Sequence, residues 1–427
     1  MGGGMKNTRL HDWHVAQGAK MADFGGYEMP LWYAAGPREE HLAVLTRVGI
    51  FDTSHMAVVL LSGSGAFDLL QFCFTKDLRR CIGKDNTPLS PGKCTYGAFL
   101  NDRGEVIDDS IVCQVGLDLY MVVVNAGMGA PVSQHLREHR NDRAVEITDL
   151  TDQLGKVDVQ GTRAARIMWK LLKKPAQVFE GMKYFNVKGY FDPKSPHADA
   201  VRLADGIPIM LSRTGYTGEF GFEIFVTSDG NVKLWEMILE AGEEFDIQPC
   251  GLAARDSLRT GATLPLSHQD IGPWPFINNP WPFTLPYNAD QTGFTKDFVG
   301  KRGLESVASP EYTYPFVGYD VRKVEVHDEQ AVVLDGDGHQ IGVVLSCVSE
   351  MGIGRHEGRV YSIASPDKPD GFVPRGLSCG FVKVKTQLVP GEEVFLRDAR
   401  REIKVEIVSD IRPDRTARAP ISTMLRS

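Results

Sequence analysis

Hydrophobic and polar residues over roughly the first 260 positions switch repeatedly between two spacings, which predicts strands and helices in alternation. Short apolar or alternating runs predict strands at 56–62, 94–101, 105–114, 118–124, 155–160, 208–213 and 222–227. Helical spacing predicts helices at 34–48, 65–73, 162–173, 230–244 and 251–259. Turn-forming runs join neighbouring strands into hairpins, and long strand–helix–strand alternation is absent. We therefore expect α+β domains with mostly antiparallel sheets.

The pattern changes near residue 311. From there short apolar runs are interrupted by Gly, Asp and Pro, which is typical of an all-β barrel or sandwich. The runs are 315–320, 331–335, 340–346, 378–385, 393–397 and 403–409. Just before them, residues 271–288 are rich in Pro, Trp and Phe, which excludes a regular helix or a central strand. We interpret this stretch as an irregular loop packed by its aromatic side chains.

The length of 427 residues is too great for one hydrophobic core, so several domains are expected. We predict a first α+β domain over 1–150, a second α+β domain over 151–310 and a C-terminal β domain over 311–427, where the pattern changes.

Composition excludes several classes of protein. The net charge of −8 argues against binding to nucleic acid through phosphate neutralisation. No apolar run approaches the ~20 residues that span a bilayer, so no membrane segment is predicted. The seven cysteines include no C-x-x-C pair, which favours reduced thiols in the cytoplasm over disulfides or a metal site. Phosphate-binding loops, dinucleotide fingerprints, H-E-x-x-H and G-x-S-x-G are also absent from the sequence.

Two adjacent acids, Asp108 and Asp109, lie in the strand predicted at 105–114. Successive side chains of a strand face opposite sides, so we expect one carboxylate to reach solvent and its neighbour to point inward. An inward carboxylate is costly unless it is paired, hydrogen-bonded or used in chemistry. The alternative is an exposed edge strand that carries solubilising acids.

A glycine-rich turn precedes a second acid. Three glycines between residues 214 and 221 permit close approach of a ligand, and Glu223 follows in the apolar strand FGFEIFV. A carboxylate there could hold the N–H groups of a flat heterocycle. The alternative is a tight hairpin in which Glu223 forms a salt bridge.

Arginines supply candidate anion-binding groups. Arg255 and Arg259 are four residues apart and share one face of the predicted helix. Spacing alone favours the alternative, an ion-pair network along the helix. The tail at 410–418 also carries several arginines, which are either solvated or close over an anionic ligand.

Eight segments in order resemble the aminomethyltransferases, the T-proteins of the glycine cleavage system. They run from GAKMADFGGYEMP at 18–30 and GIFDTSHM at 49–56, through GEVIDD at 104–109 and VVNA at 123–126, to VQG at 159–161. The rest are 214–223, 251–259 and DFVGK at 297–301. Each segment alone is a weak signal, whereas the ordered set over roughly residues 11–305 is a strong one.

The resemblance implies a three-domain cloverleaf around a central channel for tetrahydrofolate. It implies transfer of a one-carbon unit from aminomethyl-lipoyl H-protein to tetrahydrofolate, with release of ammonia. By the same resemblance Asp109 is the essential carboxylate, and it would stabilise developing positive charge. The other implied site residues line the reaction end (Tyr96, Met56 and Asn125), hold the pterin (Tyr216 and Glu223), meet the folate or its glutamate tail (Arg255) or complete the folate site (Arg418).

Three departures from the family pattern leave the donor open. The helix continues after Arg259 as Thr260-Gly261-Ala262, without the usual glutamate; Cys113 stands where an aromatic is common; and the aromatic loop is unusual. The second hypothesis is a folate-dependent demethylase or methyltransferase that acts on a small sulfonium, ether or amine, because Trp and Phe faces attract onium groups. The third is a folate-binding protein without catalysis, although the signature of the family's iron–sulfur assembly factors is absent.

Overall fold

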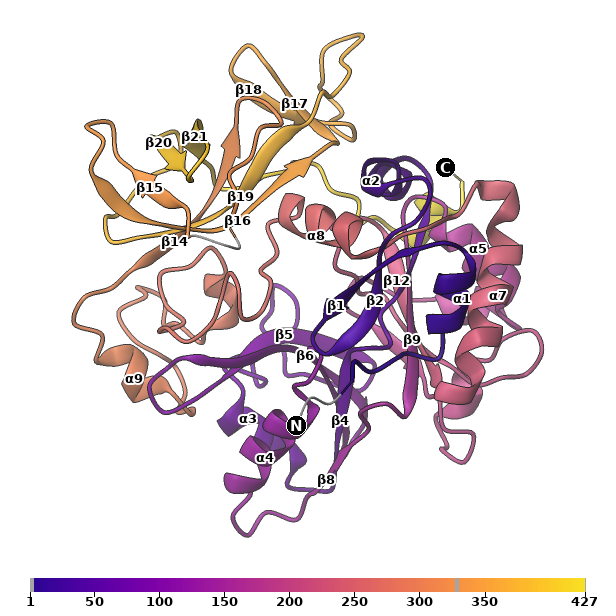
Figure 1. The fold of residues 1–427 in the computed structure, drawn as a ribbon. Coiled ribbons are helices and arrows are strands. Elements are labelled where there is room, and N and C mark those ends of the chain that lie inside the picture. Colours follow the sequence, from indigo (N-terminus) through magenta and orange to yellow (C-terminus); the bar gives the residue numbers. More distant parts are fainter. Residues whose placement is uncertain (1–3, 327–329, 427) are drawn as a thin grey trace.

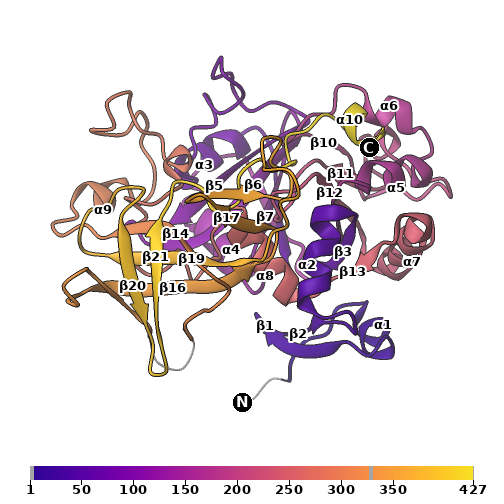
Figure 2. The ribbon, with the colours of Figure 1, turned by 90° about the horizontal axis from the view of Figure 1, so that it is seen from above.

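The computed structural model describes residues 4–326 and 330–426, which form two mixed α/β units and a barrel (Figures 1 and 2). The first unit is a five-stranded antiparallel sheet in the order β5-β6-β7-β4-β8. Its strands are β4 (Ala57–Ser62), β5 (Lys93–Leu100), β6 (Val106–Gly116), β7 (Leu119–Val124) and β8 (Glu146–Asp149). Helices α3 (Ala66–Cys73) and α4 (Gly129–Glu138) pack on one face through leucines and valines, so that face is covered.

The second unit is a six-stranded sheet in the order β10-β11-β12-β9-β3-β13. Its strands are β3 (Gly49–Asp52), β9 (Leu154–Gln160), β10 (Val187–Gly189), β11 (Met210–Ser212), β12 (Gly221–Thr227) and β13 (Gln248–Pro249). Only the pairing of β13 with β3 is parallel. Helices α5 (Ala164–Leu171) and α7 (Asn231–Gly242) share a hydrophobic core with this sheet. The predicted domain bounds stay a prediction, and β3 shows that residues before 150 contribute a strand to the second sheet.

The third unit is a closed antiparallel barrel in the order β14-β19-β16-β15-β20-β21. Its strands are β14 (Tyr312–Gly318), β15 (Val332–Leu334), β16 (Gln340–Glu350), β19 (Leu377–Val384), β20 (Glu393–Arg397) and β21 (Glu402–Ile407). Each corresponds to one of the six predicted runs. The predicted fold class, two mixed α/β units with a C-terminal all-β barrel, is therefore confirmed.

Two hairpins and several short helices complete the chain. The hairpins are β1 (Lys20–Phe24) with β2 (Tyr27–Trp32) and β17 (Ile353–His356) with β18 (Arg359–Ser362). The remaining α-helices are α1 (His11–Ala16), α2 (Pro37–Thr46), α6 (Pro175–Phe179), α8 (Leu252–Gly261), α9 (Lys301–Glu305) and α10 (Ile421–Met424). Within the described ranges no helix combines the length and the apolar character that crossing a membrane requires.

Helix α8 holds the three units together. Figure 1 shows it between the barrel and the second sheet, and its Ala254 and Leu258 pack with Val44 of α2 and Phe51 of β3. On the barrel side α8 contacts β16 and β19. A side chain on α8 can therefore reach the region where the units meet.

A buried ionic cluster also joins the barrel to the rest. Glu350, at the end of β16, accepts from Arg412 Nη1 and pairs with His41 Nε2, both at 2.6 Å, and Arg412 also lies 3.2 Å from Glu219. Burial would raise the pKa of Glu350, but Arg412 and His41 outweigh it and lower the pKa to about 2. Arg412 is buried, so the prediction that the arginines of the tail are solvated is wrong for this residue.

The loop at 271–288 is irregular apart from a short 3₁₀ turn, Pro282–Thr284. Its Phe276, Trp281 and Leu285 are buried against Leu100 of β5 and Phe381 of β19. The interpretation as a loop packed by its aromatics is confirmed. The loop fills the space between the first sheet and the barrel and so borders the acids of β6.

Candidate functional site

The acidic pair lies on β6, which is hydrogen-bonded to β5 on one side and to β7 on the other. The pairing with β7 begins at Ile111, so burial and not pairing shows that the exposed-edge alternative is wrong for the two acids. Asp108 has no exposed surface and Asp109 is partly buried, so the expectation that one carboxylate reaches solvent freely is also wrong. The reason is that both faces of this central strand are covered.

Hydrogen bonds from β5 and from the end of β7 hold Asp109. The Tyr96 hydroxyl donates to Asp109 Oδ2 at 2.8 Å, and Asn125 Nδ2 donates to Asp109 Oδ1 at 2.9 Å. Ala98 of β5 lies opposite Asp109 in the register, so Tyr96 is a diagonal neighbour on the same face. Two of the three residues predicted for the reaction end, Tyr96 and Asn125, thus contact Asp109 directly, whereas the third, Met56, contacts Arg255.

Asn125 also joins the two acids. Its Nδ2 lies 2.7 Å from Asp108 Oδ1, and its backbone N–H donates to Asp108 Oδ2 at 2.9 Å. Ser267 adds a hydroxyl donor to Asp108 at 3.1 Å. One amide therefore couples the carboxylates although they leave the strand on opposite sides.

Among the described residues, no ion pair with lysine or arginine balances the negative charge of the two carboxylates. Burial raises the pKa of Asp109, while the hydrogen bond from Tyr96 opposes this effect. Burial and then the charge of Asp109 raise the pKa of Asp108 to about 8. Across residues 4–326 and 330–426, no lysine or arginine forms an ion pair with either acid, and only His268 Nε2 lies near Asp108 Oδ1, at 3.8 Å. A positive charge that entered this position would be stabilised.

A second charged group lies on the six-stranded sheet. Glu223 of β12 is directly opposite Asp158 of β9, and Lys156 contacts both carboxylates, Asp158 Oδ1 at 2.7 Å and Glu223 Oε1 at a shorter distance. Arg255 Nη1 of α8 pairs with Asp158 Oδ2 at 3.0 Å. Two cations thus balance two carboxylates. Burial would raise the pKa of Asp158, but Lys156 and Arg255 lower it. Glu223 thus forms a salt bridge, as the alternative interpretation of this residue predicted.

Arg255 connects this group with the first sheet. Its guanidinium lies 4.9 Å from the centre of the Tyr216 ring and its Nη2 lies 3.8 Å from Met56 Sδ. Burial raises the pKa of Tyr216, and the charge of Asp109 adds to the rise, which places Tyr216 within electrostatic range of the acidic pair. Met56 and Tyr216 therefore both contact Arg255 beside the balanced group.

The two other arginines singled out in the sequence, Arg259 and Arg418, lie in different environments. Arg259 is fully buried and pairs with Asp256 of the same helix at 2.7 Å and with Asp270, whereas Arg255 pairs with Asp158 of β9, so an ion pair along the helix describes Arg259 alone of the two. Arg418 lies over the ring of Tyr184 at 5.2 Å, and the charge of Glu223 raises the pKa of that tyrosine after burial does so.

Sequence reasoning missed Lys156 and Asp158. Both are buried in a strand with Gln160, and the three occupy alternate positions of β9. Polar residues at a spacing of two in an otherwise apolar strand were the available signal. Their partners on β12 and α8 are distant in sequence, so the signal alone could not reveal the network. Ser267 and His268 were missed as partners of Asp108 for the same reason.

The fold and the site together define an enzyme of the transferase class with the architecture of glycine cleavage aminomethyltransferases. A solved structure of glycine cleavage system aminomethyltransferase T from Bartonella henselae superimposes with a TM-score of 0.71 at 25% identity, over 95% of this chain and 97% of that one.

The sequence comparisons identify the family. The family model described as GCVT N-terminal domain matches residues 10–274, and the chain belongs to this family. An aminomethyltransferase of Natranaerobius thermophilus is 31% identical over 80% of this chain and 86% of its own length. An aminomethyltransferase of Staphylococcus carnosus is 31% identical over 96% and 98%, respectively.

Proposed function

We propose that this chain transfers a one-carbon unit from the aminomethyl group of a lipoyl-carrying H-protein to tetrahydrofolate, with release of ammonia. The observation that carries the proposal is Asp109, a partly buried carboxylate without a cationic partner among the described residues, held by Tyr96 and Asn125. Such a group stabilises positive charge that develops during the reaction without reorganisation of solvent.

The groups near Asp109 suit tetrahydrofolate. Glu223 accepts from Lys156 and Thr214, and a carboxylate has about four acceptor positions, so lone pairs remain for the N–H edge of a pterin. Tyr216 offers an aromatic face, and Arg255 and Arg418 offer positive charge for the folate carboxylates. When bound, tetrahydrofolate supplies the amine nitrogens that accept the one-carbon unit.

Each of these residues then has a separate role in the proposed reaction. Asp109 holds negative charge at the reacting position, Tyr96 and Asn125 fix its orientation, and Glu223 with Arg255 would set the register of the folate. Asp109 acts in its ionised form; burial raises its pKa and opposes that form, whereas the hydrogen bonds from Tyr96 and Asn125 favour it. A cytoplasmic location belongs to this proposal, in keeping with seven cysteines that are all free of disulfides.

A donor screen tests the proposal. The full chain is incubated with tetrahydrofolate and either aminomethyl-lipoyl H-protein or small methylated amines and sulfonium compounds. The proposal predicts methylene-tetrahydrofolate and ammonia with the H-protein only. Turnover of a small donor with methyl-tetrahydrofolate as product would replace it with the second candidate.

That second candidate, a folate-dependent demethylase acting on a small onium donor, is favoured by one observation. The 3₁₀ turn brings the Phe283 ring to 6.3 Å from that of Tyr96, and Lys76 Nζ donates to the Phe283 carbonyl at 2.5 Å. An aromatic face beside Tyr96 suits an onium methyl group. Phe283→Ala distinguishes the two candidates. If a small onium donor is the substrate, the variant should raise the KM for that donor about tenfold. If H-protein is the substrate, its KM should stay within about twofold of the wild-type value.

A further inference from the structure

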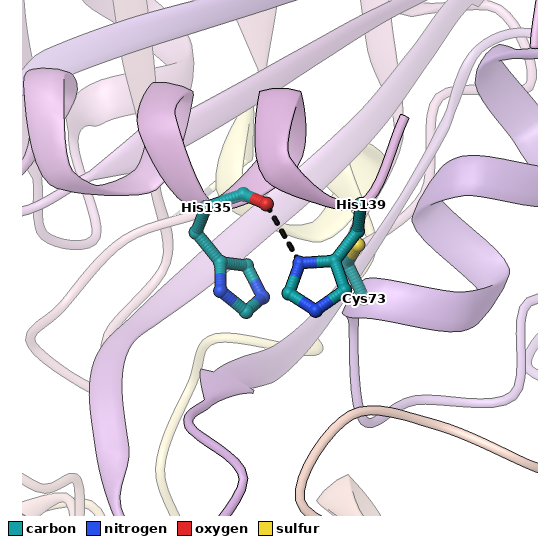
Figure 3. A group of neighbouring side chains, drawn as sticks. All are labelled: Cys73, His135 and His139. Atoms are coloured by element: carbon teal, nitrogen blue, oxygen red, sulfur yellow. Dashed lines mark hydrogen bonds between the residues drawn. The ribbon is translucent and has the colours of Figure 1, made fainter. Parts of the chain in front are cut away.

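Helices α3 and α4 bring three metal-binding side chains together beneath the first sheet, away from the acids of β6. Figure 3 shows His135 and His139 at the end of α4 with Cys73, the last residue of α3, beside them. The candidate ligand atoms of the three residues lie within 4.8 Å of one another. Cys73 and His135 are buried and His139 is partly buried.

The hydrogen bonds leave ring nitrogens available. The ring of His139 donates from Nδ1 to the carbonyl oxygen of His135 at 2.9 Å, because a carbonyl can only accept. In the neutral ring this places the lone pair on Nε2. A ring N–H held by a backbone carbonyl is the usual support of a metal-binding histidine.

His135 provides the independent observation. It is only 6% exposed, and its Nε2 is buried without a hydrogen-bond partner. A buried polar atom without a partner costs about 1–3 kcal/mol, so native proteins retain few of them. The centres of the His135 and His139 rings are 4.6 Å apart, and the rings face one another below α4 (Figure 3).

We propose that Cys73, His135 and His139 bind Zn²⁺. Thiolate and imidazole are the ligands that zinc prefers, and histidines four residues apart on a helix share one face. Zinc–ligand bonds of ~2.0–2.3 Å put tetrahedral ligand atoms about 3.3–3.6 Å apart, which side-chain rotation of roughly 1 Å supplies. Binding forms a sulfur–zinc bond, and the thiol proton of Cys73 passes to solvent.

The surroundings provide a route to the site. A cavity of about 460 Å³ is lined by Phe72 and Arg143, among others. The Phe72 ring packs 5.9 Å from that of His139, and Arg143 Nη1 donates to the His139 carbonyl at 3.0 Å. The cavity therefore adjoins the ligand that is only partly buried. An open fourth position for water is expected on that side.

The positive charges near the cluster limit its affinity. Arg143 is one, and Lys296, which donates to the carbonyls of Gln71 and Phe74 at 2.5 Å, is the other. Burial lowers the pKa of Lys296 to about 7, so that amine is largely uncharged above neutral pH.

Cysteine spacing alone predicted no metal site, because the histidines come from a different helix. Two helices of the first unit would be cross-linked by the ion. Because the three ligands come together in the folded chain, zinc should raise the unfolding temperature with the logarithm of its concentration above Kd.

The test uses the full chain, stripped of metal and titrated with Zn²⁺ and with Co²⁺ as a spectroscopic substitute. We expect about one equivalent of zinc per chain, a thiolate-to-cobalt charge-transfer band and a rise in unfolding temperature. Cys73→Ser and His139→Asn should abolish the band and the rise in temperature. Cys81→Ser, which removes a neighbouring thiol outside the cluster, should retain both.

Two outcomes would overturn the proposal. One is a wild-type chain that gives no cobalt–thiolate band at saturating Co²⁺, a result that does not depend on any variant folding. The other is zinc binding that survives Cys73→Ser and disappears in His339→Asn. That result would assign the ion to the exposed group of Asp335, Asp337 and His339 on the barrel.

Discussion

Two groups of buried charge, one on each sheet, differ in how they are compensated. On the six-stranded sheet, Lys156 and Arg255 balance Asp158 and Glu223. On the five-stranded sheet, Asp108 and Asp109 receive hydrogen bonds from neutral donors, without an ion pair to lysine or arginine in the part of the chain that the structure describes. The balanced group is suited to a fixed binding surface, whereas the uncompensated pair is suited to charge that appears only during a reaction.

The largest effect on stability is expected from the balanced group. Lys156→Met leaves Asp158 opposite Glu223 with one cation fewer, so the free energy of unfolding should fall by about 3–5 kcal/mol. Denaturant unfolding measures it. Lys170→Met is the matched control, because Lys170 pairs with Glu244 at the surface and should cost less than about 1 kcal/mol. Equal effects of the two variants would contradict the comparison.

Glu223→Ala tests the same group as a binding surface. It removes the acceptor proposed for the pterin and should weaken tetrahydrofolate binding by about 1–3 kcal/mol, the cost of partners left unpaired. Fluorescence titration measures Kd, with Glu240→Ala on the exposed side of α7 as control. An unchanged Kd would remove Glu223 from the folate site.

Tyr96→Phe tests the support of Asp109. The variant deletes the 2.8 Å hydrogen bond to the carboxylate, and kcat should fall about 10- to 150-fold, the equivalent of the ~1.5–3 kcal/mol of a bond to a charged group. The pKa of Asp109 should rise, because that hydrogen bond favours the ionised form. A pH profile of kcat should therefore shift its acidic limb upward, and an unshifted profile would count against the assigned contact.

The smallest effect on rate is expected from Asp108→Asn. Burial and the charge of Asp109 raise the pKa of Asp108 and so favour its neutral form, and the neutral amide should therefore change kcat less than about threefold.

The same raised pKa predicts how stability depends on pH. The unfolded carboxyl ionises near pH 3.9, so the stability contributed by protonated Asp108 is present below that value and is lost as the pH rises through about 8. Unfolding measured from pH 4 to 9 should show a decline in the wild type that is shallower in Asp108→Asn. Parallel curves would mean that Asp108 is ionised in the fold.

Local pattern was sufficient for much of the fold. The runs that became β20 and β12 were predicted almost to the residue, because each alternates or is continuously apolar and is bounded by turn residues. The hairpin of β17 and β18 was missed, since its strands carry exposed polar residues such as Arg359 and give no periodic signal. The place of β3 beside β9 depends on a pairing over more than a hundred residues, which spacing cannot reveal.

Only the site residues that lie within the family motifs could be predicted from the sequence. Strand alternation separated Asp108 from Asp109, and the resemblance chose Asp109. Neither indicated that Asn125 would contact both, or that Lys156 would occupy the oxygens of Glu223 and Asp158. Those contacts depend on how two sheets and α8 meet, which is decided by packing and not by local sequence.

Asp109→Asn gives the most direct test of the account. Rate and tetrahydrofolate affinity are measured on the same preparation. Asparagine keeps the shape of the side chain, removes its charge and replaces one acceptor oxygen with a donor. We predict that kcat falls by about 10²–10³ or more while Kd for tetrahydrofolate stays within about threefold. A variant that retains the wild-type kcat, or that loses activity only through weaker folate binding, would contradict the role of the uncompensated carboxylate.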